Sequence, residues 1–77
     1  MAQFFFHVRQ ENTLFEDRRG GEFADVRAAW AWALHEAKAM MLENSLRGSQ
    51  ENHWIEIQDA HGTLVATLPF VRVTSLH

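Results

Sequence analysis

Residues 54–68 read WIEIQDAHGTLVATL, and this stretch decides the fold. Apolar and polar residues alternate on either side of Asp59-Ala60-His61-Gly62, as in two strands that each bury one face. Asp at the first position and Gly at the fourth favour a type I turn closed by a glycine bulge. The stretch therefore predicts a β-hairpin that ends near Pro69, and we expect its inward side chains to be Ile55, Ile57, Leu64, Ala66 and Leu68.

A second hairpin is predicted at the start of the chain. Residues 3–9 alternate, so that Phe4, Phe6 and Val8 share one face, which is the better core candidate. The opposite face would carry Gln3, Phe5, His7 and Arg9. Residues 10–12 then indicate a turn with Asn12 in the left-handed conformation, and residues 13–17 a short strand with Leu14 inward.

A long helix is predicted between the two hairpins. Residues 18–21 resemble a flexible connector, Phe23 an anchor, and Asp25 an N-cap that accepts hydrogen bonds from the first turn. The helical pattern runs from Val26 to about Arg47, with Gly48 as C-cap. Its apolar stripe consists of Val26, Ala29, Trp30, Ala33, Leu34, Ala37, Met40 and Met41.

The order β-β-α-β-β predicts an α+β fold in one domain that spans residues 1–77. Because a lone hairpin is marginal in water, we expect a four-stranded sheet with the long helix packed on one face. A β-grasp-like order, with the first and last strands in the centre, ranks first. The predicted core unites both hairpins and the helix: Phe4, Phe6, Val8, Trp30, Ala33, Ala37, Met41, Ile55, Ile57, Leu64 and Leu68.

Composition narrows the function classes. The chain has no cysteine, which excludes disulfides and thiolate metal ligands, and its formal net charge of −3 weighs against nucleic-acid binding. No segment is long and apolar enough for a membrane span, and the short apolar start indicates a strand rather than a signal peptide. We therefore expect a cytoplasmic protein. So small a domain buries a modest core, which favours self-association.

Two aromatic surfaces lie outside the predicted core. A single helix covers one side of the sheet, so the other side would expose Phe5, His7, Trp54 and Glu56, which is unusually aromatic for solvated surface. The helix carries a second apolar set away from its core stripe, namely Trp32, Leu42 and Leu46. The tail Val71–Leu76 is an alternative cover for that set. All seven residues are candidates for an interface.

Catalytic and metal-binding motifs are weak. The five histidines show no metal-ligand spacing, and neither a nucleophile elbow nor a phosphate loop is present, so we expect no metal and no cofactor. We also expect no small-molecule ligand. His7 across the sheet from Glu56 could form an acid/base couple, although a polar pair within an interface is the more common arrangement.

The opening Phe4-Phe5-Phe6-His7-Val8, the Gly-rich connector, the Ala-rich helix, Asp59-x-x-Gly62, and Leu64 through Pro69-Phe70 occur in a familiar order. The chain resembles a family of small uncharacterised bacterial proteins, abundant in alphaproteobacteria such as rhizobia, classed as a domain of unknown function. The resemblance extends from Phe4 to Phe70 and implies a stand-alone cytoplasmic domain without a known activity. Trp30 and Trp32 depart from the small or charged residues expected in the family's helix.

The leading hypothesis is a non-enzymatic interaction module that self-associates, most simply as a homodimer. The first alternative is a nucleic-acid-associated regulatory domain, with Phe5 and Trp54 as stacking rings and Arg9, Arg18 and Arg19 as basic edges. A small enzyme that uses His7 and Glu56 is the second alternative.

Overall fold

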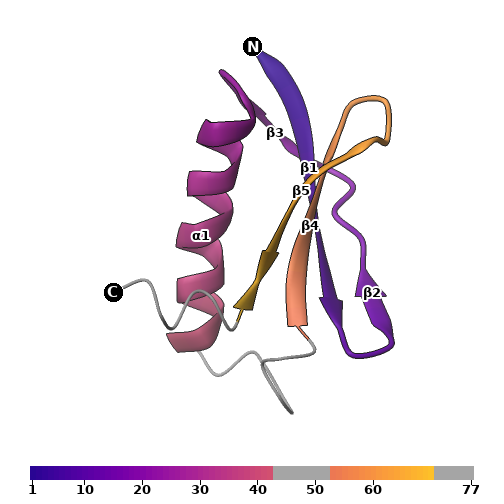
Figure 1. Cartoon of the computed structure of the whole chain (residues 1–77), viewed down its shortest axis with the longest axis vertical. Helices are drawn as coiled ribbons and strands as arrows, with labels where there is room; N and C mark the ends of the chain where they lie inside the picture. Colours follow the sequence, from indigo (N-terminus) through magenta and orange to yellow (C-terminus); the bar gives the residue numbers. More distant parts are fainter. Residues whose placement is uncertain (43–52, 71–77) are drawn as a thin grey trace.

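The computed structural model describes residues 1–42 and 53–70, with side chains up to residue 40 and from residue 53. One antiparallel sheet is covered on one side by one helix, which confirms the predicted α+β class (Figure 1). The elements are β1 (Ala2–Gln10), β2 (Thr13–Phe15), β3 (Gly21–Phe23), α1 (Val26–Leu42), β4 (His53–Asp59) and β5 (Leu64–Pro69). The predicted helix end at Arg47, its Gly48 cap and the tail Val71–Leu76 lie outside the described residues.

The strand order is β2-β1-β4-β5, with β3 also paired to β1. The expected β-grasp-like order is wrong, because β4 rather than the last strand lies beside β1, and the two are antiparallel. Their register places Phe6 opposite Ile57 and Val8 opposite Ile55. This pairing unites the apolar faces of the two longest strands, which is how a half-buried sheet fixes its register.

The segment expected to be a flexible connector contains β3, so that prediction is wrong in part. Gly21 pairs with Phe4 and Phe23 with Ala2, and the three-residue strand is too short to show an alternating pattern. Since β3 and β4 are both antiparallel to β1, they run parallel to each other. Helix α1 joins them across one face of the sheet (Figure 1).

Asp25 precedes helix α1 and caps its first turn, as predicted. Oδ1 of Asp25 accepts a hydrogen bond of 2.9 Å from the amide of Ala28, and the Asp25 carbonyl accepts one of 3.1 Å from the amide of Ala29. This satisfies amides of the first turn that have no partner within the helix. Val26 was expected in the core stripe but is 38% exposed, because it lies in this first turn at the end of the sheet.

The core combines the predicted faces of the sheet and the helix. The expected inward parity of β1 and β4 is confirmed, and the small helix residues allow the helix backbone to approach the sheet. Val8, Trp30 and Phe23 are partly buried against this core. The buried apolar side chains are Phe4, Phe6, Ala29, Ala33, Ala37, Ile55, Ile57, Leu68 and Phe70. The side chain of Met41 lies outside the described set.

Two leucines predicted to face inward do not. Leu14 lies opposite Arg9 on the outer face, and Leu64 is 52% exposed opposite Gln58. A register shift between Ile57 and Gln58 marks a bulge in this pair of strands. Because a bulge inserts one extra residue, consecutive Val65 and Ala66 both contact the core and Leu64 is displaced to the other face.

The turns follow their local chemistry, with one correction. At Asp59–Gly62 the Gly62 amide donates to the Asp59 carbonyl at 3.0 Å and Gly62 has φ +81°, which confirms the predicted turn and bulge. In the first hairpin the left-handed residue is Glu11, with φ 56°, rather than Asn12. The register pairs Gln10 with Thr13, so the loop has two residues and its first position takes the positive φ.

We expect Phe6→Ala to lower the free energy of unfolding by about 3–5 kcal/mol, because the ring is 8% exposed in the centre of the core. Phe15 is the matched control, since it lies opposite Val8 on the same face of the sheet but is 53% exposed. Phe15→Ala should cost about 1 kcal/mol or less. Urea unfolding measures both, and equal losses would contradict the described core.

Candidate functional site

The side of the sheet opposite α1, termed the open face, gathers the candidate residues from β1 and β4. Phe5, His7, Trp54 and Glu56 all lie on it, as predicted from their parity. Arg9 and Gln58 share this side through the same register, and Leu14 and Leu64 extend it onto β2 and β5. The two leucines that left the core therefore add apolar surface to both flanks of the open face.

An Arg–Trp–Glu cluster is central to the open face. Oε2 of Glu56 accepts hydrogen bonds from Trp54 Nε1 at 2.8 Å and from Arg9 Nε at 3.1 Å. The Arg9 guanidinium lies 5.9 Å from the centroid of the Trp54 ring, within cation–π range. The hydrogen bond from Trp54 lowers the pKa of Glu56 most strongly; burial raises it, and the hydrogen bond and charge of Arg9 lower it further, so that it lies below its usual value. The cluster holds the indole in a defined position.

His7 is held by partners other than Glu56. The two residues face each other in the register, but the hydrogen bonds of His7 go to the Asp17 amide at 3.0 Å and to Gln58 Oε1 at 3.3 Å. Because the amide must donate, Nδ1 of His7 accepts, which leaves the proton of the neutral ring on Nε2 for Gln58. Among the described residues, His7 and Glu56 thus belong to two separate hydrogen-bonded groups.

Asp17 closes the free edge of β1 between β2 and β3. Its Oδ2 accepts the Phe6 amide at 3.1 Å, and its Oδ1 accepts the amides of Arg19 at 3.0 Å and Gly20 at 3.1 Å. Burial raises the pKa of Asp17, but the three amide hydrogen bonds together lower it below its usual value. The carboxylate therefore replaces the strand that β1 lacks at this point.

Gly20 makes that closure sterically feasible. It has φ +67°, and a Cβ at this position would lie 2.5 Å from the Phe4 carbonyl oxygen. Asp17-x-x-Gly20 thus repeats the Asp59-x-x-Gly62 pattern, in which Asp59 Oδ1 accepts the amides of His61 and Thr63. Sequence reasoning identified only the second motif, although the matching Asp and Gly spacing was a usable signal for the first.

Trp32 lies on the other side of the sheet from Trp54. Its ring centroid is 4.8 Å from that of Phe6 and 5.8 Å from that of Phe23. It also borders a groove of about 460 Å³ that Glu36, Met40 and residues of β1 and its edge loop line. Of the second apolar set predicted on the helix, Trp32 packs partly on the core. Leu46 and the side chain of Leu42 lie outside the described residues.

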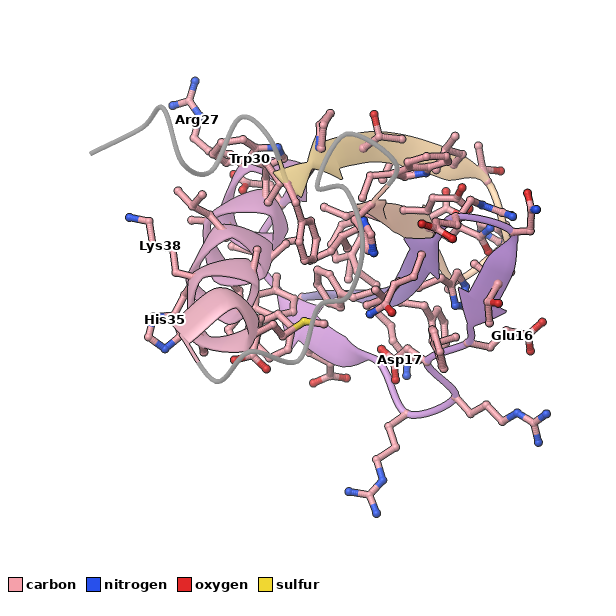
Figure 2. All side chains as sticks on the ribbon, turned by 90° about the horizontal axis from the view of Figure 1, so that it is seen from below. Glu16, Asp17, Arg27, Trp30, His35 and Lys38 are labelled. Carbon is pink, nitrogen blue, oxygen red and sulfur yellow. The ribbon has the colours of Figure 1, made fainter. Side chains whose placement is uncertain are left out.

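The polar side of α1 faces away from the sheet. Figure 2 shows Arg27, His35 and Lys38 directed away from the sheet, while Asp17 lies at the edge of the sheet opposite β5. Within residues 1–42 and 53–70, no three His, Cys, Asp or Glu side chains form a group that could hold a metal ion. No helix of the described part has the length and hydropathy needed to cross a membrane.

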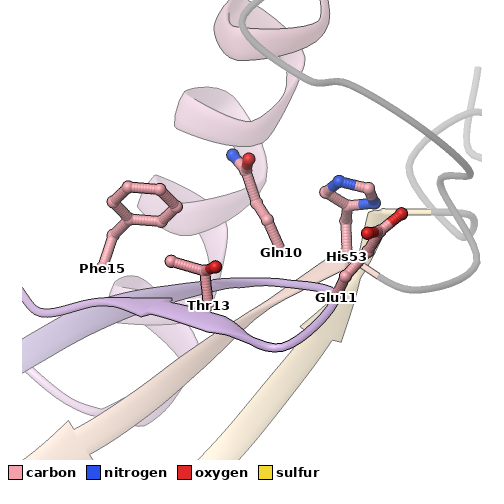
Figure 3. Close-up of a pocket in the computed structure, with 5 residues that line it drawn as sticks. All are labelled: Gln10, Glu11, Thr13, Phe15 and His53. Atoms are coloured by element: carbon pink, nitrogen blue, oxygen red, sulfur yellow. The ribbon is translucent and has the colours of Figure 1, made fainter.

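A small pocket lies where the β1–β2 turn meets the start of β4. Figure 3 shows its lining, which consists of Gln10, Glu11, Thr13, Phe15 and His53, and its volume is about 190 Å³. His53 is the first residue of β4 and is only 1% exposed. Burial of a polar ring opposite Gln10 depends on strand pairing, so local sequence gave no signal for it.

Acid should destabilise the protein through Asp17 and Glu56. Both have a pKa lowered by folding, so their contribution is complete above the unfolded values of about 4 and is lost as pH falls through the folded values. We expect the free energy of unfolding to drop below about pH 4, and Asp17→Asn to flatten that drop. Urea unfolding between pH 7 and pH 2 measures the effect. The exposed neighbour Glu16→Gln is the control, and an unchanged slope in Asp17→Asn would contradict the prediction.

Comparison with known proteins places the sequence in a family. No curated protein and no solved structure matches the chain significantly. A family model does match, over residues 3–71, and that match includes β1 through β5, the Asp17 and Asp59 motifs and the open face. The chain therefore belongs to the family described as Domain of unknown function (DUF6894).

Proposed function

We propose that the protein is a non-enzymatic interaction module that self-associates through the open face. The observation that carries the proposal is the position of Phe5 and Trp54 on the central strands, on the side of the sheet that α1 does not cover. Exposed Leu14 and Leu64 continue this apolar character on both flanks. Contiguous aromatic and aliphatic surface of this kind is typical of protein interaction sites.

The polar groups on the open face are already paired within the chain. Glu56 is bonded to Arg9 and Trp54, and His7 to Asp17 and Gln58. Burial of a charge without a partner is costly, whereas a charge that keeps its partner can be covered at lower cost. A second copy could therefore cover the face without leaving these side chains unsatisfied. A two-fold axis would place the same patch on both sides of the contact.

The pairing of Arg9 supports self-association over nucleic-acid binding. A guanidinium that neutralises Glu56 is less available to a phosphate, and the formal net charge of −3 repels a polyanion. The separation of His7 from Glu56 into two groups likewise favours a non-enzymatic role over an acid/base couple. Both nitrogens of His7 are occupied, one by Asp17 at the β1 edge and the other by Gln58 on the neighbouring strand β4.

Trp54→Ala tests the proposed contact. We expect the weight-average mass at micromolar concentration to be about half that of the parent, because loss of a central interface Trp weakens association by about 2 kcal/mol or more, roughly 30-fold. Trp32→Ala is the matched control: it removes an indole from the other side of the sheet and should keep the parent's mass. Light scattering measures the mass, and circular dichroism confirms that both variants fold.

The mass of the parent protein can contradict self-association through the open face. A parent mass of 8.9 kDa that does not rise on concentration would show that the open face does not join copies of this chain. Equal masses for the parent and Trp54→Ala would exclude the open face as the contact.

A further inference from the structure

The two edges of the sheet differ in how they are protected. At the β1 edge, β2 and β3 contain three residues each, and the Asp17 carboxylate fills the space between them. Charged side chains accompany this edge, among them Glu16, Arg18, Arg19 and Glu22. Short strands and charges are the usual means by which a sheet edge avoids pairing with another chain.

The β5 edge has neither short strands nor charges, and its protection is limited to Pro69 at its last residue. β5 has six residues, and within the described part of the chain it pairs with β4 alone. The sequence contains no Asp, Glu, Lys or Arg from residue 60 to residue 71. Among Leu64 to Leu68, Val65 and Thr67 are β-branched residues with high strand propensity, and the others are aliphatic or small. An uncharged edge of this length is a template for a further strand.

Pro69 indicates which amides of β5 are free. Proline has no amide hydrogen, so it fits a strand paired on one side when its nitrogen points away from the partner. Pro69 lies opposite Trp54, and the register continues without a break through Leu68 to Thr67 opposite Glu56. Alternate residues of an antiparallel strand direct their backbone groups the same way. The Thr67 amide therefore points away from β4, toward the free edge.

We propose that β5 pairs antiparallel with β5 of a second copy, so that two sheets become one continuous sheet. A second copy is the favoured occupant because the edge is uncharged along its length, and antiparallel pairing with itself opposes no like charges. The two-fold axis runs perpendicular to the sheet. Both helices then lie on one side of the joined sheet and both open faces on the other.

Edge pairing is independent of the contact through the open face. It uses the backbone of β5, whereas the open-face contact uses Phe5 and Trp54. The two-fold axis of the face contact lies parallel to the sheet, at right angles to the axis of the edge contact. When the two axes intersect, the contacts combine into a closed assembly of four chains.

Thr67→Pro tests the edge directly. It removes one outward amide, and Ala66 before it already has the extended backbone that a following proline requires. Thr67→Val keeps the amide and the branched shape, and is the matched control. We expect light scattering to show half the parent's mass for Thr67→Pro and an unchanged mass for Thr67→Val. If Thr67→Pro does not fold, hydrogen exchange of the parent decides, because Thr67 lies opposite Glu56 on the open face and a charged side chain there would disturb both contacts.

Hydrogen exchange of the Thr67 amide reports on backbone pairing at the edge, independently of side-chain contacts on the open face. In a concentrated sample of the parent, the Thr67 amide should exchange about tenfold more slowly, or slower still, than in a diluted sample, because pairing protects it. The edge proposal is overturned if a folded Thr67→Pro keeps the parent's mass, or if the Thr67 amide exchanges as fast as turn amides at every concentration. If Thr67→Pro halves the mass while Trp54→Ala does not, the edge contact stands and the open-face contact fails.

Discussion

The carboxylate of Asp17 is the interaction on which the arrangement of the sheet depends. Strand β1 must be bordered by two short strands, one from the first hairpin and one that leads into α1, and neither reaches Phe6. Asp17 accepts the Phe6 amide and the amides of its own turn, so the edge has no unsatisfied donor at that point. This allows the chain to leave β2, start β3 and enter the helix on one side of the sheet.

Because the chain passes from β2 through β3 into α1 on one side of the sheet, the other side and the β5 edge remain exposed in the described part of the chain. One helix covers one side, so the open face keeps Phe5 and Trp54, and its charges are paired in advance through Glu56. The β1 edge is closed within the chain, whereas β5 is the last strand of the sheet among the described residues and has an uncharged edge. A small domain without cysteine has few other sources of stability, and association through such surfaces would add to its buried area.

The fold was predictable where local chemistry and pattern agree. Alternation placed Phe4, Phe6, Ile55 and Ile57 inward, and the Asp25 cap and Asp59–Gly62 turn were visible in the residues themselves. That the chain is a domain of unknown function was also predicted, from the order of these motifs. Most of what failed depended on partners distant in sequence: the strand order, β3, the displacement of Leu64 by a bulge, and the burial of His53. The first hairpin failed locally, because its loop has two residues, with Glu11 in the left-handed conformation and Leu14 on the outer face. The candidate residues on the open face were predictable from parity, but their hydrogen-bond partners were not, since Arg9 and Asp17 reach them only after the strands pair.

Residue-resolved hydrogen exchange of the Phe6 amide tests the central claim most directly. If Asp17 closes the β1 edge within one chain, this amide should exchange only through global unfolding, as slowly as core amides, at every protein concentration. An amide that exchanges near the rate of an unstructured chain, or whose protection disappears on dilution, would contradict the account. The β1 edge would then be open or closed by another copy, and the contrast between the two edges of the sheet would be lost.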